Sequence, residues 1–138
     1  MSKMIIFSDG GARGNPGPAG IGAVIYNEKK EVLATISQYL GETTNNQAEY
    51  HALLVALKKA QELGADQVEC FLDSELVVKQ LNLEYKIKSK ELAPLFLEVY
   101  NLSWEFVGIS FTHIPREQNT VADKLANQAM DRGETISQ

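Results

Sequence analysis

Cysteine is almost absent from the 138-residue sequence, since the single one, Cys70, lies inside an apolar stretch. One cysteine cannot form a disulfide within the chain, so a disulfide-stapled fold is excluded and a reducing compartment is expected. Long hydrophobic runs are absent too. No stretch approaches the roughly 20 apolar residues of a membrane span, and the first residues show no signal-peptide pattern. We therefore expect a cytoplasmic protein without a membrane partner.

Basic residues are also scarce. The sequence has 13 lysines and arginines against 18 aspartates and glutamates, which gives a net charge of −5. This balance argues against broad, non-specific binding to a polyanion. A nucleic-acid site on this chain must therefore be local, and metal ions would help it to offset phosphate charge. A chain of 138 residues is long enough for one domain with its own core, so we expect a single domain over residues 1–138.

Hydrophobic periodicity and turn residues predict an α/β domain whose elements follow the order β-β-β-α-β-α-α-β-α. The predicted elements are a strand over 3–9, a hairpin over 20–40 with its turn at 27–31, a helix over 43–65, a strand over 67–73, a helix over 74–82, a helix after Pro94 that reaches 102, a strand over 104–114 and a helix over 119–131. This order predicts one mixed sheet with helices packed against it. The hairpin is antiparallel, whereas the strand over 67–73 runs parallel to the first strand because a helix connects them.

Acidic residues recur where predicted strands end. Asp9 and Asp73 each close a buried strand, and ligand sites in open α/β sheets lie beyond the carboxyl ends of the strands. Glu49 lies one helical turn before Leu53 on the same face, so it points towards the core, where an unpaired carboxylate is costly. Asp123 lies near the start of the last helix. If the two strands are neighbours, these acids gather at one place.

Three of these acids also have a purely structural interpretation. Asp9 can be a turn residue, and Asp73 can be the N-cap of the helix over 74–82. Asp123 can pair with Thr120 in a capping box. Taken together, however, the four acids indicate one cluster, and such carboxylates repel one another unless a cation is bound. Hard oxygen ligands of this kind suit Mg²⁺ or Mn²⁺. Two such ions about 3.5–4 Å apart are a common device for in-line phosphoryl displacement.

Four ordered motifs cover almost the whole chain. They are "SDGGARGNPGPAG", "TTNNQAEYHAL", "LDSELVVKQL" and "IPREQNTVADKLAN", and they strongly resemble the signature blocks of type 1 ribonuclease H from about residue 4 to residue 130. The resemblance implies a ribonuclease H-like α/β fold, a five-stranded mixed β-sheet flanked by α-helices. It also implies an endonuclease that hydrolyses the RNA strand of RNA–DNA hybrids with two Mg²⁺ or Mn²⁺ ions. The family's metal-binding acids fall on Asp9, Glu49, Asp73 and Asp123.

The same resemblance suggests how the substrate is held. Glycines in the first motif let the backbone approach a nucleic-acid strand without side-chain bulk, and amides can bind 2′-hydroxyls and base edges without depending on sequence. Asn119, one helical turn before Asp123, could touch the attacking water or the second metal. The expected substrate-binding residues are Gly10, Gly11, Asn15, Asn45, Asn46, Gln47 and Asn119. The alternatives are a tight hairpin entry for the glycine loop and helix capping for the amides, among which Thr44 and Gln47 form a capping-box pattern.

Two features depart from the family pattern. Many members insert a basic, tryptophan-containing protrusion, whereas the segment over 81–92 here offers only Lys86, Lys88 and Lys90, and we expect a correspondingly modest affinity for hybrid. Many members also carry a mobile histidine in the loop before the last acid. Here that loop supplies Arg116 and Glu117 instead, and the nearby His113 falls in the preceding predicted strand, where a structural role is the simpler interpretation.

Two other functions compete with hybrid cleavage. The first is a catalytically inactive hybrid-binding module on the same fold, against which the acids at all four positions argue. The second is a different phosphoryl hydrolase built on the Asp-Gly-Gly turn, in which the "TNNQAEY" block would have no obvious role. We expect a monomer that needs no obligate protein partner.

Overall fold

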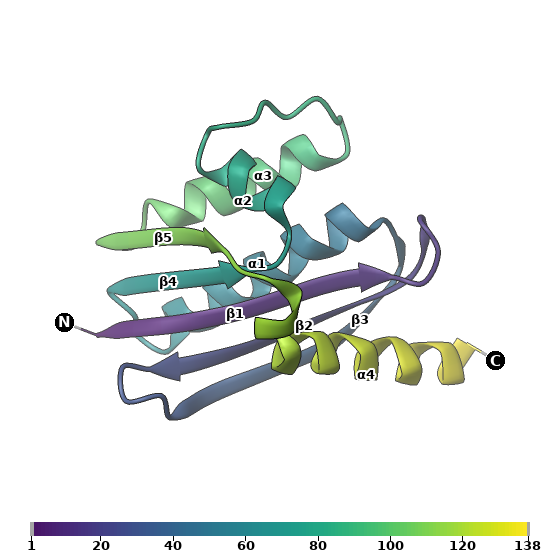
Figure 1. The fold of residues 1–138 in the computed structure, drawn as a ribbon, viewed down its shortest axis with the longest axis horizontal. Coiled ribbons are helices and arrows are strands. Elements are labelled where there is room, and N and C mark those ends of the chain that lie inside the picture. The colour runs from purple at the N-terminus through teal and green to yellow at the C-terminus, as the bar shows by residue number, and fades with distance from the viewer. Residues whose placement is uncertain (1, 138) are drawn as a thin grey trace.

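A five-stranded mixed sheet lies at the centre of the molecule (Figure 1). The structure is a computed structural model that describes residues 2–137, with side chains described for residues 2–133. Its strands are β1 (Lys3–Ala12), β2 (Gly17–Asn27), β3 (Val32–Thr43), β4 (Gln67–Leu72) and β5 (Gly108–His113). Its helices are α1 (Asn45–Glu62), α2 (Glu75–Leu81), α3 (Leu92–Ser103) and α4 (Thr120–Ser137), with a 3₁₀ turn, η1 (Arg116–Gln118), before α4.

The strands lie in the order β3-β2-β1-β4-β5. The pairs β1–β2 and β2–β3 are antiparallel, whereas β1–β4 and β4–β5 are parallel. Helix α1 connects β3 to β4, and it packs on the opposite face of the sheet from α4, which crosses β2 and β3 (Figure 1). The five-stranded mixed sheet flanked by helices is therefore confirmed, together with the parallel pairing of the strand over 67–73 with the first strand.

The main core lies between the sheet and α1. Side chains from alternate positions of β1 and β4 meet the apolar face of α1, and α2 and α3 close the far side. Its fully buried members include Ile6, Ile25, Leu53, Leu57, Cys70, Val77 and Val99. A smaller layer forms where α4 lies on β2, and small residues dominate it, among them Ala122, Ala126 and Ala129. The described residues contain no helix that is both long and apolar enough to cross a membrane.

Several predicted boundaries differ from the structure, and three of them have a clear physical reason. The first strand does not end at Asp9 but continues to Ala12, because β1 keeps pairing with β2 after its pairing with β4 has ended at Ser8. Helix α3 begins at Leu92 rather than after Pro94, since a proline in the first turn of a helix removes an N–H that has no intrahelical acceptor. The strand predicted over 104–114 begins only at Gly108, because Trp104 ends α3.

The packing of α4 on the sheet predicts the outcome of a glycine substitution. A Cβ at Gly22 would lie 2.2 Å from the carbonyl oxygen of Ala122 and 2.5 Å from the backbone nitrogen of Ala126. We expect Gly22→Ala to lower the free energy of unfolding by about 1–3 kcal/mol, the usual range for an overpacked core. Urea denaturation would measure the change.

The control is Gly108→Ala on the edge strand β5, where the atom nearest to the added Cβ would be 3.6 Å away, an ordinary contact. That variant should be neutral or slightly stabilised. An equal decrease in the free energy of unfolding for the two variants would contradict the close approach of α4 to Gly22.

Candidate active site

Three carboxylates that are far apart in the sequence meet at one point. Asp9 comes from β1, Glu49 from the first turns of α1, and Asp73 directly follows β4. Each side chain offers an oxygen, and these oxygens all lie within 4.8 Å of one another. The predicted gathering of these three acids is therefore present in the fold. Their spacing would let the three carboxylates share one cation.

The parallel pairing of β1 with β4 brings Asp9 and Asp73 together. The last paired positions of the two strands are Ser8 and Leu72, and each acid is the next residue along its chain. Asp73 is not the N-cap of α2, because Ser74 holds that position and its side chain accepts a hydrogen bond from the Val77 N–H. The capping interpretation of Asp73 is therefore wrong.

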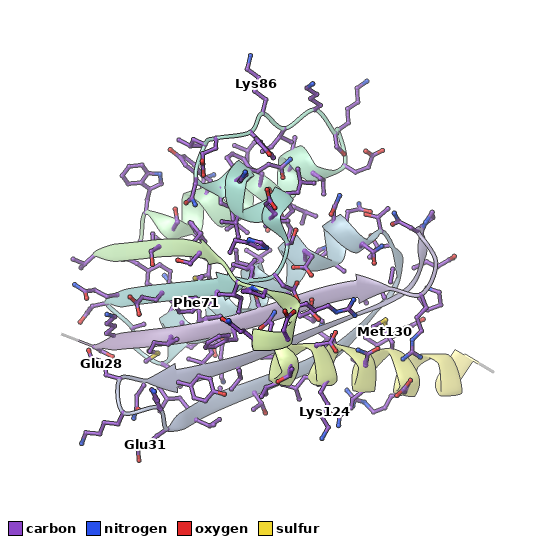
Figure 2. All side chains as sticks on the ribbon, viewed as in Figure 1. Glu28, Glu31, Phe71, Lys86, Lys124 and Met130 are labelled. Atoms are coloured by element: carbon purple, nitrogen blue, oxygen red, sulfur yellow. The ribbon has the colours of Figure 1, made fainter. Side chains whose placement is uncertain are left out.

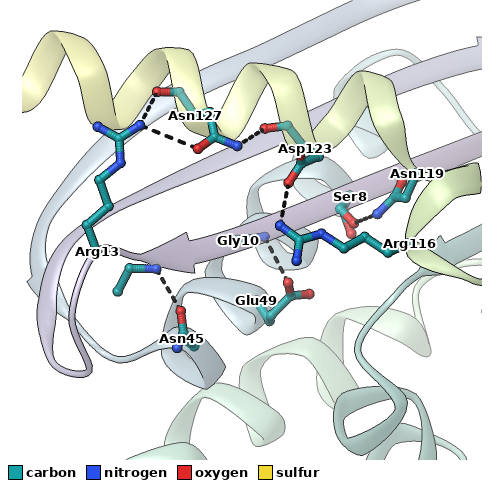
Figure 3. A network of polar contacts seen from close by, with 10 residues as sticks. Ser8, Gly10, Arg13, Asn45, Glu49, Arg116, Asn119, Asp123 and Asn127 are labelled. Atoms are coloured by element: carbon teal, nitrogen blue, oxygen red, sulfur yellow. Dashed lines mark hydrogen bonds and ion pairs between the residues drawn. The ribbon is translucent and has the colours of Figure 1, made fainter.

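Glu49 reaches the cluster because α1 lies directly against β1. A Cβ at Gly10 would fall 2.2 Å from the carbonyl oxygen of Ala48, so only glycine permits this approach. The Gly10 N–H then donates a hydrogen bond of 3.1 Å to Glu49 Oε1 (Figure 3). Glu49 Oε2 is buried and has no hydrogen-bond partner among the described residues.

Asp123 approaches the cluster from the other helix. It lies in the first turn of α4, and its carboxylate is close enough to Asp9 to raise the pKa of that acid. Arg116 lies across the opening, with its Nη2 3.6 Å from Asp123 Oδ1 (Figure 3). Helix α4 begins at Thr120, so Thr120 does not hold the N-cap position that a capping box with Asp123 would require.

Burial and mutual repulsion make the acids hard to ionise. Burial is the main cause that raises the pKa of Asp9 from 3.8 to about 7, and the charges of Asp73 and Asp123 add to it. Burial raises the pKa of Glu49 well above its ordinary value, with a further contribution from Asp9, and it also raises the pKa of Asp73. A divalent cation would relieve both effects, and these hard oxygen donors fit Mg²⁺ or Mn²⁺.

The acids line an open cleft of about 490 Å³. Four of the predicted substrate-binding residues line it as well: Gly10, Gly11, Asn45 and Asn46. Asn15 lies at its edge, where its Oδ1 accepts a hydrogen bond of 3.0 Å from the Asn45 N–H. The cleft therefore joins the acids to the backbone of Gly10 and Gly11 and to the amides of Asn45 and Asn46.

Two predicted substrate contacts lie elsewhere. Gln47 is the capping-box partner of Thr44, as the capping alternative predicted, and its Oε1 accepts from the Thr44 hydroxyl at 2.9 Å. Asn119 is only 1% exposed, and its Nδ2 donates to the carbonyl oxygen of Ser8 at 2.9 Å. The structure thus places Asn119 behind the acids rather than in the open cleft.

His113 lies where the sequence predicted it, in a strand. It is the last residue of β5 and is exposed, close enough for its charge to act on Asp73. Glu117 is exposed in η1 and is not among the residues that line the cleft.

Sequence reasoning missed one wall of the cleft. The turn between β1 and β2 is joined to α4 through Arg13, whose guanidinium lies 2.6 Å from Asp131 Oδ1. The guanidinium also contacts the side chain of Asn127 (Figure 3). Asn127 and Met130 line the cleft together with Arg13. The spacing of Asn127, four residues after Asp123 on one helix face, is the signal that could have revealed it.

The chain resembles known proteins over nearly its full length. A family model described as reverse transcriptase-like matches residues 7–129. A bifunctional protein of Mycobacterium tuberculosis is 45% identical over 94% of this chain but only 36% of its own length. This chain thus spans about a third of that relative.

Two further matches cover nearly the whole of both aligned chains. The LC11 ribonuclease H1 isolated from compost, solved in complex with an RNA/DNA hybrid, is 48% identical with a TM-score of 0.89, and the match covers 94% of this chain and 98% of that one. A protein of Ruthia magnifica named ribonuclease H is 32% identical, and the match covers 96% of this chain and 98% of that protein. Since the matches include a ribonuclease H aligned almost from end to end, this chain belongs to the ribonuclease H family.

Proposed function

We propose that this protein is a metal-dependent endonuclease that hydrolyses the RNA strand of RNA–DNA hybrids. The observation that carries the proposal is the cluster of Asp9, Glu49 and Asp73, with ligand oxygens within 4.8 Å of one another, at the base of an open cleft that Asp123 also lines. The similarity to the LC11 enzyme, which was solved with an RNA/DNA hybrid, supports the choice of substrate.

Asp9, Glu49, Asp73 and Asp123 would hold two divalent ions, Mg²⁺ or Mn²⁺. When bound, these ions would supply an activated water and stabilise the charge on the leaving oxygen. The carboxylates would fix the ions, and Asp9 is central because Glu49 and Asp123, the acids of the two opposite helices, both act on its pKa.

The rest of the cleft would orient the substrate. The backbone of Gly10 and Gly11 faces the cleft without side-chain bulk, and Asn45 and Asn46 add amides at the start of α1. These groups can bind the wide minor groove of a hybrid without reading sequence. Arg116 is largely exposed at the opening and can hold a phosphate through a charge-assisted pair.

A small basic surface lies farther away. Lys86, Lys88 and Lys90 are exposed on the loop between α2 and α3, and Figure 2 shows Lys86 at the tip of that loop, on the far side of the molecule from Met130 on α4. With a net charge of −5 on the chain, three lysines give weak electrostatic support. We therefore propose a modest affinity for hybrid, with most of the recognition inside the cleft.

All four acids come from one chain, so we propose that residues 1–138 act as one catalytic domain and as a monomer. The competing function, a catalytically inactive hybrid-binding module, would use the same cleft. Incubation with labelled RNA–DNA hybrid, duplex RNA, duplex DNA and single strands, with and without Mg²⁺ or Mn²⁺, separates the two. Metal-dependent cleavage of the hybrid alone supports the enzyme, and binding without cleavage supports the module.

The first prediction from this proposed function concerns Asp73. Asp73→Asn preserves the shape of the side chain but removes a charge that the ions share, so hybrid cleavage should fall by several orders of magnitude while circular dichroism stays unchanged. The control is Asp66→Asn, which changes the same residue type at the opposite end of β4. It should cleave like the unmodified protein. Near-normal activity of Asp73→Asn would contradict the metal-dependent mechanism.

The second prediction concerns pH and metal. Because the pKa of Asp9 is about 7 in the folded state against an ordinary 3.8, the folded chain keeps a proton that the unfolded chain loses between about pH 4 and pH 7. The metal-free protein should therefore become less stable as the pH rises through this window. Saturating Mn²⁺ at pH 7.5 should restore stability, since the ion binds only the folded state. Thermal melts with and without metal would measure both effects.

Glu49→Gln tests the same repulsion. The amide can keep the hydrogen bond from Gly10, but it removes one carboxylate from the cluster. Without metal at pH 7.5, this variant should melt at a higher temperature than the unmodified protein, and it should gain nothing from Mn²⁺. A lower metal-free melting temperature would show instead that Glu49 supports the fold.

The third prediction concerns His113. It is exposed beside Asp73, and its loss should reduce the cleavage rate by less than about tenfold, the scale of one orienting contact worth roughly 1.4 kcal/mol. The rate should keep rising into the alkaline range without an inflection near pH 6.5, the ordinary histidine value. A hundredfold loss in folded His113→Ala, together with the disappearance of such an inflection, would identify His113 as the general acid–base.

A further inference from the structure

Asn119 is a buried amide at the junction of the elements that carry the acids. It lies between η1 and α4 and is among the largest fully buried side chains of the described residues. Its Nδ2 donates a hydrogen bond of 2.9 Å to the carbonyl oxygen of Ser8, a residue 111 positions away in the sequence (Figure 3). The side chain thus ties the last connecting segment of the chain to its first strand.

That hydrogen bond falls at a critical point of the sheet. Ser8 and Leu72 form the last pair between β1 and β4, and Asp9 and Asp73 follow immediately. Asp9 and Asp73 are not themselves a pair of this ladder, which ends one residue before each of them. The amide of Asn119 holds the Ser8 carbonyl at the point where the pairing ends.

The backbone of Asn119 acts on the third acid. Its carbonyl oxygen accepts a hydrogen bond of 3.1 Å from the N–H of Asp123, and its own N–H donates to the carbonyl of Arg116 at 3.0 Å. These bonds set the direction in which α4 begins. Asn119 also lies close enough to Asp73 to favour its charged carboxylate, which opposes the rise in the pKa of Asp73 that burial causes.

Packing alone does not explain an amide at this position. Asn119 Oδ1 is buried and has no hydrogen-bond partner among the described residues. An unpaired buried oxygen is unfavourable, so an apolar side chain of similar size would serve the fold better if filling space were the only requirement.

We propose that Asn119 is a positioning residue, which holds Asp9, Asp73 and Asp123 in the relative arrangement that divalent ions require. The proposal rests on the proposed function, because it assigns a role at the same site. It replaces the sequence-based expectation that Asn119 touches the substrate, since the side chain acts from behind the acids.

Asn119→Ala in the full chain tests the proposal, with Mn²⁺ alone as the probe in isothermal titration calorimetry. Groups that orient metal ligands from behind typically change affinity or activity by about 10–100-fold, so the variant should bind Mn²⁺ at least about tenfold more weakly. At saturating Mn²⁺, kcat for hybrid cleavage should fall while KM for the hybrid stays near its original value, because the cleft surface is intact.

The matched control is Gln80→Ala. Gln80 is also a buried amide, and its Oε1 accepts a hydrogen bond from the Tyr50 hydroxyl in the core of α1 and α2. Its loss should lower the melting temperature but leave Mn²⁺ affinity and kcat unchanged. If Gln80→Ala weakens Mn²⁺ binding as much as Asn119→Ala does, general destabilisation explains both, and the proposal is wrong.

The remaining outcomes also decide the question. If Asn119→Ala does not fold, Asn119→Leu fills the space without the hydrogen bonds, and its Mn²⁺ affinity takes the place of the first measurement. Failure of both variants to fold would show that the amide supports the fold itself and would overturn the proposal, as would Mn²⁺ affinity and kcat within twofold of the unmodified protein. If the unmodified protein neither binds Mn²⁺ nor cleaves hybrid, the proposed function fails instead.

Discussion

The close approach of α1 to β1 at Gly10 is the contact on which the cleft depends. Gly10 has no side chain, and a Cβ at this position would lie only 2.2 Å from the carbonyl oxygen of Ala48 in α1. The Gly10 N–H can then bind Glu49, and the carboxylate of Glu49 emerges beside Asp9. Any side chain at Gly10 would push α1 outward and take Glu49 away from the cluster.

The cluster that this contact creates works against the stability of the metal-free fold. Asp9 and Glu49 are both buried, and burial favours the neutral form of each, while mutual repulsion raises the pKa of Asp9 further. A fold selected only for stability would place apolar or hydrogen-bonded groups here. Carboxylates that resist ionisation in the absence of a cation are suited to bind one, because the ion supplies the charge that the site lacks.

The sequence was sufficient to predict the sheet, the order of the elements and the gathering of the acids, because strand ends and helix faces are local patterns. It could not decide between adjacent residues with equal local propensity. Asp73 and Ser74 are both good N-caps, and only the fold shows that Ser74 caps α2 and leaves Asp73 to the cluster. The burial of Asn119 was beyond prediction, since its partner Ser8 is 111 residues away. The end of β1 was misjudged because a glycine-rich stretch favours a turn, whereas pairing with β2 keeps it extended to Ala12.

Two glycines next to Asp9, one in β1 and one in β2, have a structural consequence that links both faces of the sheet. Asp9 is paired across the ladder with Gly22, and a Cβ there would lie 2.2 Å from the Ala122 oxygen of α4. One glycine beside Asp9 in the chain thus admits α1 with Glu49, and another glycine opposite Asp9 in the sheet admits α4 with Asp123. Because a helix normally rests on a sheet through a layer of side chains, carboxylates from two opposite helices would not otherwise reach one strand residue. The absence of side chains at Gly10 and Gly22 therefore allows acids from helices on both faces of the sheet to share one site.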